Sequence, residues 1–525
     1  MIETSIIHNI KKSAAGQHWQ RIGIKHHHGI VLPLFSLKSF LSCGIGEYPD
    51  LLPLIPWVRS IGFDVIQLLP LNDTGRESSP YNALSAFALN PIHLGLHQLP
   101  FSPEVPNCSS LNQRKKINYP EVYAFKDSFL RQYNAKYGDQ LKEKADYQSF
   151  KNKAAFWLFD YARYKSFKVL QNWKPWEEWF PILRDFPQSL ESELSDQVVK
   201  EMDYQILLQY LCFHQLESVK QSADAHGVYI KGDIPILINR DSSDVWRYRQ
   251  LFLLEFSAGA PPDMYAKEGQ KWGFPLYSWE QMAIKSYQWW CERLHTASTC
   301  YHLYRLDHIV GFFRIWAIPL ALAPQLGHYI PENQDEWIPH GKQLMQVMLD
   351  ASGMLPIGED LGTIPPEVRT CLRSLGICGT KVVRWERSWN TDKQYIDPKN
   401  YPPESMTTVS THDSETLAEW WKNQTNEAMD YAAWHGWTYT PELKRDLREK
   451  IIYESHHSGS LFHINLLQEY LALIPGMTWE NIDDERINIP GTISDRNWTY
   501  RFRPFIEEII ANPDLQAAMR DVIRV

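Results

Sequence analysis

Three acidic side chains, Asp307, Glu359 and Asp413, each come at the end of a short apolar run that has the length of a strand. An ionised carboxylate can act as a nucleophile, and a carboxylic acid about 5–5.5 Å away can donate a proton to a glycosidic oxygen. A third ionised acid can bind sugar hydroxyls and stabilise an oxocarbenium-like transition state. Together the three acids could carry out a retaining reaction on a glycosidic bond.

Two basic residues accompany these acids. Arg305 precedes Asp307 by two residues, so on a strand both side chains face the same side. We expect Arg305 to keep Asp307 ionised, as a nucleophile requires. His412 adjoins Asp413 and could donate a hydrogen bond to a sugar hydroxyl. A structural role remains open for each acid, because acids at strand ends often cap the following helix.

The elements that must position these acids are short strands that alternate with helical segments. Such alternation predicts parallel βα units. In a closed (β/α)8 barrel the functional groups lie at the carboxyl ends of the strands, and Asp233 also falls at such an end. We therefore predict the α/β class and a (β/α)8 TIM barrel with helical insertions. The strand-length runs are residues 29–34, 63–70, 227–233, 301–307, 354–359 and 406–413.

The domain organisation follows from where this alternation stops. From residue 123 to residue 225 the apolar residues recur with helical spacing and no strand-like run intervenes. We predict one catalytic barrel domain over residues 1–525, with a mainly helical insertion over residues 93–225. Residues 440–473 also have a largely helical pattern.

Composition narrows the class of protein. The net charge of -9, without a basic stripe, argues against a nucleic-acid partner. No apolar run reaches eighteen residues and the N-terminus lacks a secretory signal, so we expect no membrane partner. The seven scattered cysteines, without a CxxC pair, favour reduced thiols over a disulfide framework. We expect a cytoplasmic protein.

Two other motifs were considered as a metal site and as a dinucleotide-binding loop. His26, His27 and His28 are consecutive, and neighbours on an extended chain point to opposite faces, so we expect no metal site there. The segment Gly44-Ile45-Gly46 lacks the third glycine of a dinucleotide fingerprint and is more typical of a βα turn.

Seven segments together resemble one known family. Residues 305–308 (Arg-Leu-Asp-His), followed by Gly311-Phe312-Phe313-Arg314, resemble the nucleophile motif of glycoside hydrolase family 77, the 4-α-glucanotransferases called amylomaltases or disproportionating enzymes. Residues 358–362 are similar to the acid/base motif of that family, and residues 411–413 to its transition-state-stabiliser motif. The other similar segments are 79–91, 232–235, 260–273 and 486–498, and the resemblance runs from about residue 33 to residue 501 in family order.

The resemblance implies a fold, a reaction and a set of site residues. It implies a (β/α)8 barrel that cleaves α-1,4-glucosidic bonds and transfers the glucan to the 4-hydroxyl of a glucan or glucose acceptor. Asp307 would be the nucleophile, Glu359 the acid/base and Asp413 the stabiliser, with no cofactor and no metal. The implied substrate-binding residues are Arg305, His412, Ser79, Tyr81, Asp233, Asp263, Gln270, Trp272, His308 and Asn488.

The sequence is most similar to one branch of that family. Gly273-Phe274-Pro275 resembles the plant cytosolic members and their chlamydial-type bacterial relatives, whereas Cys43 stands where many members have tryptophan. This likeness implies maltose, maltodextrins and glycogen-type glucans as partners, and it leaves protein partners unknown. Two alternatives remain open: an α-glucan hydrolase with the same three acids, and a catalytically inactive glucan-binding barrel.

Overall fold

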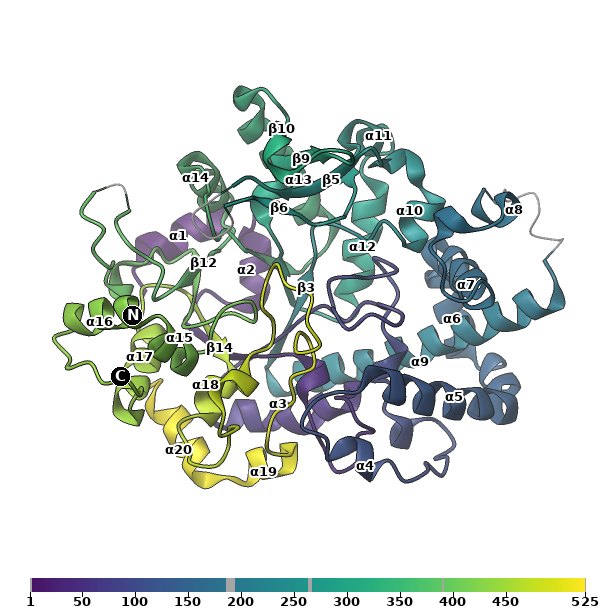
Figure 1. The fold of residues 1–525 in the computed structure, drawn as a ribbon, viewed down its shortest axis with the longest axis horizontal. Helices are drawn as coiled ribbons and strands as arrows, with labels where there is room; N and C mark the ends of the chain where they lie inside the picture. The colour runs from purple at the N-terminus through teal and green to yellow at the C-terminus, as the bar shows by residue number, and fades with distance from the viewer. Residues whose placement is uncertain (1, 186–193, 263–266, 390, 525) are drawn as a thin grey trace.

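The fold is built around eight parallel strands. The computed structural model describes residues 2–185, 194–262, 267–389 and 391–524. The strands pair in the order β11-β8-β3-β2-β1-β14-β13-β12, and a parallel bridge between Ile357 and Cys378 links the two ends of this order. The predicted α/β barrel is therefore confirmed (Figure 1). The strands are β1 His27–Leu32, β2 Val65–Leu68, β3 Tyr229–Ile234, β8 Leu303–Leu306, β11 Leu355–Gly358, β12 Gly379–Val382, β13 Ser405–Thr408 and β14 Phe462–Leu466.

Six of these strands overlap the runs predicted from the sequence, and two were missed. Strand β14 lies in residues 440–473, so the prediction of a largely helical segment there is wrong for Phe462–Leu466. All five residues of β14 are buried, because helices cover the outside of a parallel barrel and side chains fill its inside. The strand therefore shows no alternation that would separate it from the helices on either side.

Helices surround the barrel and fill the stretch between β2 and β3. Helix α9 begins after Ser195, whose hydroxyl accepts a hydrogen bond from Val198 N, and ends at Gly227 with a φ of +64°, as a left-handed cap requires. Figure 1 shows these helices on the right-hand side of the barrel. They are α4 Ser109–Asn112, α5 Tyr119–Lys142, α6 Ala145–Lys153, α7 Ala155–Leu170, α8 Pro181–Arg184 and α9 Asp196–His226.

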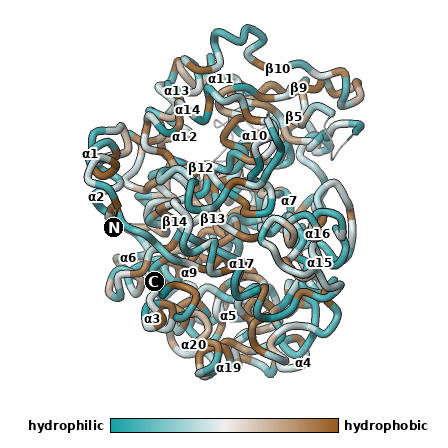
Figure 2. Tube along the Cα trace, turned by 90° about the vertical axis from the view of Figure 1, so that its left-hand side faces the viewer, coloured by the Kyte–Doolittle hydropathy of each residue, from teal (hydrophilic) through white to brown (hydrophobic). Residues whose placement is uncertain are grey.

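The remaining helices pack mostly on the outside of the strands. In Figure 2 brown hydrophobic segments run through the interior, between teal hydrophilic loops. No helix within the described ranges is both long and apolar enough to cross a membrane. These helices are α1 Thr4–Lys12, α2 Gly16–Ile22, α3 Leu51–Ser60, α10 Ser243–Arg247, α11 Trp279–Ile284, α12 Gln288–Ser298, α13 Trp337–Ala351, α14 Pro366–Leu375, α15 Leu417–Asn423, α16 Thr425–Trp434, α17 Arg445–His456, α18 Leu467–Leu471, α19 Ile506–Ala511 and α20 Pro513–Asp521.

Two small antiparallel sheets form from the loops that follow β3 and β8. One has the order β10-β9-β5-β6, and Figure 1 shows it at the upper edge of the molecule. Because it grows from the carboxyl ends of two neighbouring strands, it lies beside the end of the barrel where the acids are. The strands are β4 Phe252–Leu253, β5 Phe256–Ala260, β6 Gln270–Lys271, β7 Leu276–Tyr277, β9 Ile315–Pro319 and β10 His328–Ile330, with β4 paired to β7.

Candidate active site

The predicted acids converge because neighbouring strands end together. Asp307 directly follows β8, Glu359 directly follows β11, and Asp233 is the penultimate residue of β3. These three strands are adjacent, and Asp233 pairs in register with Arg305. Parallel strands end at the same edge of a barrel, so residues far apart in the chain meet there.

Arg305 is the hub of this group. Its Nη1 lies 2.8 Å from Asp307 Oδ1 and 3.0 Å from both carboxylate oxygens of Asp233, and its Nη2 lies 3.9 Å from Glu359 Oε2. Burial opposes a charged guanidinium, but the surrounding carboxylates outweigh it and raise the pKa of Arg305. A fixed positive charge at this position allows several acids to share one small volume.

Glu359 is held by two backbone donors. His308 N donates to Oε2 at 3.0 Å, and Leu361 N donates to Oε1 at 2.8 Å. Burial raises the pKa of Glu359 to about 7, with Asp307 acting in the same direction and Arg305 opposing it. A carboxyl group with this pKa can both give and take a proton near neutral pH, which is the requirement for an acid/base.

Asp413 has the opposite electrostatic character. Asn488 Nδ2 donates to Oδ1 at 2.6 Å, and His412 Nε2 lies 3.1 Å from Oδ2. Burial favours the neutral acid, but His412, Asn488 and Arg305 outweigh it and lower the pKa of Asp413 to about 2. The side chain is 42% exposed, so an ionised carboxylate is available to a ligand.

Tyr81 connects the two halves of the site. Its hydroxyl donates to Asp233 Oδ2 at 2.9 Å and lies 2.9 Å from His412 Nε2, and its ring stacks on the His412 ring. A continuous series of contacts therefore runs from Glu359 through Arg305, Asp233, Tyr81 and His412 to Asp413 and Asn488. Ser79 is partly buried in the same loop, two residues before Tyr81.

Trp272, directly after β6, contacts His308, the residue that follows the nucleophile candidate Asp307. The Trp272 ring meets the His308 ring edge-on at 5.1 Å, and Trp272 Nε1 donates to Gln270 Oε1 at 3.0 Å. Burial lowers the pKa of His308, which favours the neutral imidazole. The predicted residue Asp263 lies outside the described residues.

Two residues that we had not assigned to the site also support Asp413. Arg486 Nη2 donates to Asp413 O at 3.3 Å and Arg486 Nε donates to Asn488 O at 2.7 Å. The Trp498 ring packs against Tyr81 and His412. Both residues belong to the family-like segment 486–498, which was the signal that could have identified them.

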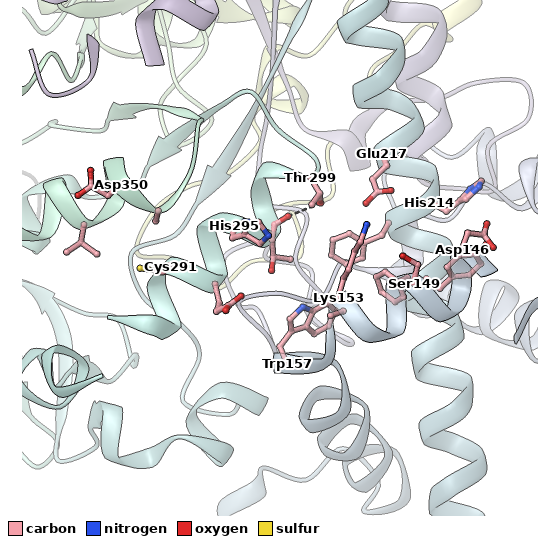
Figure 3. Close-up of a pocket in the computed structure, with 18 of the residues that line it drawn as sticks. Asp146, Ser149, Lys153, Trp157, His214, Glu217, Cys291, His295, Thr299 and Asp350 are labelled. Atoms are coloured by element: carbon pink, nitrogen blue, oxygen red, sulfur yellow. Dashed lines mark hydrogen bonds between the residues drawn. The ribbon is translucent and has the colours of Figure 1, made fainter. Parts of the chain in front are cut away.

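A separate cavity, with a volume of about 1080 Å³, lies away from these acids. It opens between α6, α7 and α9 on one side and α12 and α13 on the other, with Trp157, Glu217 and His295 in its lining (Figure 3). Asp307, Glu359 and Asp413 do not line it. The reaction site is therefore defined by the geometry of the acids and not by the size of this cavity.

The described residues were also compared with the requirements of a metal site. Within those ranges no group of three or more His, Cys, Asp and Glu residues is arranged to hold a metal ion.

Known proteins resemble this chain over nearly its whole length. The 4-alpha-glucanotransferase family model matches residues 32–507. The chain is 44% identical over 523 residues to a 4-alpha-glucanotransferase of Chlamydia caviae, covering 98% of this chain and 97% of the relative. It is also 44% identical to a 4-alpha-glucanotransferase of Chlamydia pneumoniae, covering 96% and 97%. An amylomaltase from Streptococcus agalactiae, solved in complex with acarbose, has the same fold, with a TM-score of 0.80, 22% identity and 95% and 98% coverage.

Proposed function

The chain belongs to the 4-alpha-glucanotransferase family, glycoside hydrolase family 77, and we propose that it cleaves α-1,4-glucosidic bonds with retention and transfers the glucan to a sugar hydroxyl. The enzyme uses Asp307 as nucleophile and Glu359 as acid/base. Asp413 stabilises the transition state. One spatial relation supports this proposal. Arg305 contacts both Asp307 and Glu359, and Glu359 accepts a hydrogen bond from the backbone of His308, the residue after Asp307.

The first step forms a glycosyl-enzyme. An Asp307 oxygen attacks the anomeric carbon, and the bond to the leaving glucan oxygen breaks. Glu359 gives its proton to that oxygen, which its pKa of about 7 allows at neutral pH. Asp413 stays ionised and stabilises the positive charge that develops on the sugar ring.

The second step transfers the sugar. The 4-hydroxyl of an acceptor glucan attacks the anomeric carbon and displaces the Asp307 carboxylate. Glu359, now ionised, takes the proton of that hydroxyl, so the enzyme returns to its starting state. No external cofactor or metal takes part in either step. The edge of Trp272 beside His308 offers an apolar surface near the reacting sugar.

Incubation with maltotriose tests the reaction type. A transferase converts maltotriose into glucose and longer glucans, which thin-layer separation resolves. A hydrolase with the same acids produces only glucose and maltose. A catalytically inactive glucan-binding barrel leaves maltotriose unchanged. Either of the last two outcomes would overturn the proposal.

We also propose maltose as a donor and glycogen as an acceptor, with maltodextrins as further substrates. The support is the sequence Gly273-Phe274-Pro275 beside Trp272, in the loop that reaches His308. Rim loops of this kind set specificity in a TIM barrel, while strand ends hold the reacting groups. Glucose release from maltose should increase when glycogen is added. Inert maltose, with maltotriose consumed, would reject this substrate preference and leave the transferase proposal intact.

We also propose a cellular location for the enzyme. All seven cysteines are free thiols, which suits a reducing compartment, and we place the enzyme in the cytoplasm. Fractionation of the source cells would test this: recovery in an extracellular or envelope fraction would contradict it.

A further inference from the structure

Two cysteines far apart in the sequence meet at the rim of the barrel. Cys43 lies in the loop between β1 and α3, and Cys108 immediately precedes α4. Each thiol shifts the pKa of the other, so the two side chains lie near each other. Cys43 Sγ also lies 3.9 Å from Leu41 O, and Cys108 Sγ lies 3.7 Å from Ser42 O, so both thiols sit against consecutive carbonyls of the same short segment.

The surrounding contacts fix the two segments against each other. Asn112 Nδ2 donates to Ser39 O at 2.6 Å, and Ser42 Oγ donates to Asn112 Oδ1 at 3.1 Å. A Cβ on Gly44 would lie only 2.8 Å from Leu111 Cβ, which shows how closely the backbones approach beside the cysteines. The two segments that carry the cysteines are therefore held together by hydrogen bonds that do not involve the thiols.

The two thiols differ in access and in acidity. Cys43 is fully buried, with an exposed fraction of 0%, whereas Cys108 is partly exposed. The interaction with Cys43 lowers the pKa of the Cys108 thiol, while the same interaction and burial raise the pKa of the Cys43 thiol. Burial and Glu47 oppose a Cys108 thiolate, and Lys126 favours it. Because Cys108 is the more accessible thiol, we expect an oxidant to reach it first and the buried Cys43 to resolve it.

We propose that Cys43 and Cys108 form a redox-active pair, which a hydroperoxide converts reversibly into a disulfide that fastens the rim loop after β1 to the segment at α4. The Cys108 thiolate attacks the terminal peroxide oxygen, forming an S–O bond as the O–O bond breaks; the leaving alkoxide, or hydroxide in the case of hydrogen peroxide, takes up the proton that Cys108 released. The Cys43 sulfur then displaces the hydroxyl from Cys108, and its proton joins the leaving hydroxide as water. Two thiols lose two electrons, and the peroxide is reduced to water and the corresponding alcohol or second water. A small dithiol restores both thiols.

The cross-link lies at a structural support of the candidate active site. Arg501 binds Asn112 through its side-chain and backbone oxygens, at 2.7 and 2.8 Å. Tyr119 Oη donates to Trp498 O at 2.8 Å, and the Trp498 ring packs on Tyr81. A disulfide here restrains the rim without touching the reacting acids, so the oxidised protein should be more stable to heat and still able to disproportionate maltotriose.

Peptide mapping of the full chain tests the pair directly. The reduced protein is treated with hydrogen peroxide, alkylated and digested without reductant. We expect a mass loss of two hydrogens, a linked peptide containing Cys43 and Cys108, and a melting temperature higher by a few degrees, all reversed by dithiothreitol. Cys291→Ser, on α12, is the matched control and should keep the linked peptide. Absence of the link in wild-type protein, or a link between other cysteines, would overturn the proposal.

Single variants separate the two roles. In Cys43→Ser, peroxide should leave a sulfenic acid on Cys108 that dimedone labels. In Cys108→Ser, the buried Cys43 should remain unlabelled. Equal labelling in both variants would reject the assigned order of attack. If neither variant folds, the linked peptide and the reversible melting shift of the wild-type protein still decide whether the pair exists. A loss of more than about tenfold in maltotriose activity on oxidation would reject a restraint that spares the acids.

Discussion

The two ends of the barrel bury ionisable groups in opposite ways. At the carboxyl end Asp233, Asp307 and Glu359 surround the guanidinium of Arg305. At the amino end four histidines face one another: His26, which precedes β1, His28 of β1, His456 of α17 and His463 of β14. The first group is matched by opposite charge, whereas the second consists mainly of groups that would repel each other if protonated.

The amino end is therefore neutral where the carboxyl end is charged. His28 Nδ1 lies 2.8 Å from His456 Nδ1, and His26 Nδ1 lies 3.1 Å from His463 Nε2. Burial lowers the pKa of His28 to about 4 and that of His456 and His463 well below the usual value. The buried charges lie at the carboxyl end, beside the proposed reaction site. The buried imidazoles at the amino end are neutral and contribute packing and hydrogen bonds.

Removing the nucleophile should have the largest effect at the charged end. Asp307→Asn keeps the shape of the side chain but cannot form the covalent intermediate, so we expect maltotriose turnover to fall by roughly 10³-fold or more. Glucan affinity and the melting temperature should stay close to those of the wild type. The control is Asp350→Asn, an exposed position on α13. Activity above a few per cent of wild type in cleanly purified Asp307→Asn would remove Asp307 from this role.

Glu359→Gln should produce a loss that depends on the leaving group. Natural glucans need the proton of Glu359, so most activity on them is lost. A maltosyl fluoride needs little protonation, and formation of the glycosyl-enzyme from it should largely persist. Glu367→Gln, at an exposed position of α14, should behave as wild type. Equal losses with both donors would show that Glu359 is not the acid.

The pKa of Glu359 also sets a direction for the pH profile. The acid must be protonated in the first step, so kcat/KM should decline as the pH rises above about 7. This decline should vanish in Glu359→Gln with the fluoride donor. An alkaline limb that persists there would assign the titration to another group.

Asn488→Ala should have an intermediate effect, because it removes a donor and not a reacting group. The lost hydrogen bond to Asp413 is charge-assisted, so we expect kcat/KM to fall about 10- to 100-fold. The reduction should be similar from pH 6 to pH 8, since Asp413 has a pKa of about 2 and stays ionised throughout. Asn423→Ala, at an exposed position of α15, is the control. Unchanged kinetics would show that Asn488 does not position Asp413.

The amino end should respond to acid through stability. The unfolded chain takes up protons on histidine below about pH 6.5, while the folded cluster resists them, so stability is lost as the pH falls. Each histidine that stays neutral in the folded cluster lowers the free energy of unfolding by about 1.4 kcal/mol per pH unit as the pH falls from about 6.5 to its folded pKa. Asp64 favours protonation of His28, whereas His26, His27 and His457 oppose it. His456 and His463 also lie against its ring, and a charge on His28 lowers the pKa of both.

Thermal unfolding at several pH values measures this slope. Between pH 6.5 and pH 5, the melting temperature of His28→Asn should fall less steeply than that of the wild type. The melting temperature of His214→Gln, at an exposed position of α9, should fall as steeply as that of the wild type. Identical slopes in wild type and His28→Asn would show that the cluster does not resist protonation.

Chelation of metal should have the smallest effect of all. The proposed reaction uses carboxylates alone, and the histidines of the amino end pair with each other or with Tyr470. We expect full maltotriose activity after exhaustive treatment with EDTA. Activity lost on chelation and restored by Ca²⁺ or Zn²⁺ would require a metal role at one of the two ends.

The sequence by itself determined the kind of fold and singled out the three acids that we propose to react. Asp307 and Glu359 could be identified because local runs such as 301–307 and 354–359 end in an acid, and strand ends of a barrel are where functional groups lie. The spacing of Arg305 and Asp307 is also local, and the 2.8 Å ion pair agrees with it.

Only the tertiary structure decided the relations between distant segments. It revealed β12, whose four residues alternate between half-buried and buried, and β14, which is buried throughout and pairs with β1. It placed Trp498 against Tyr81, Arg486 behind Asp413, Cys43 beside Cys108 and His28 beside His456. Residue type and spacing report on neighbours along the chain, whereas these contacts depend on which strand ends and loops the closed barrel brings together.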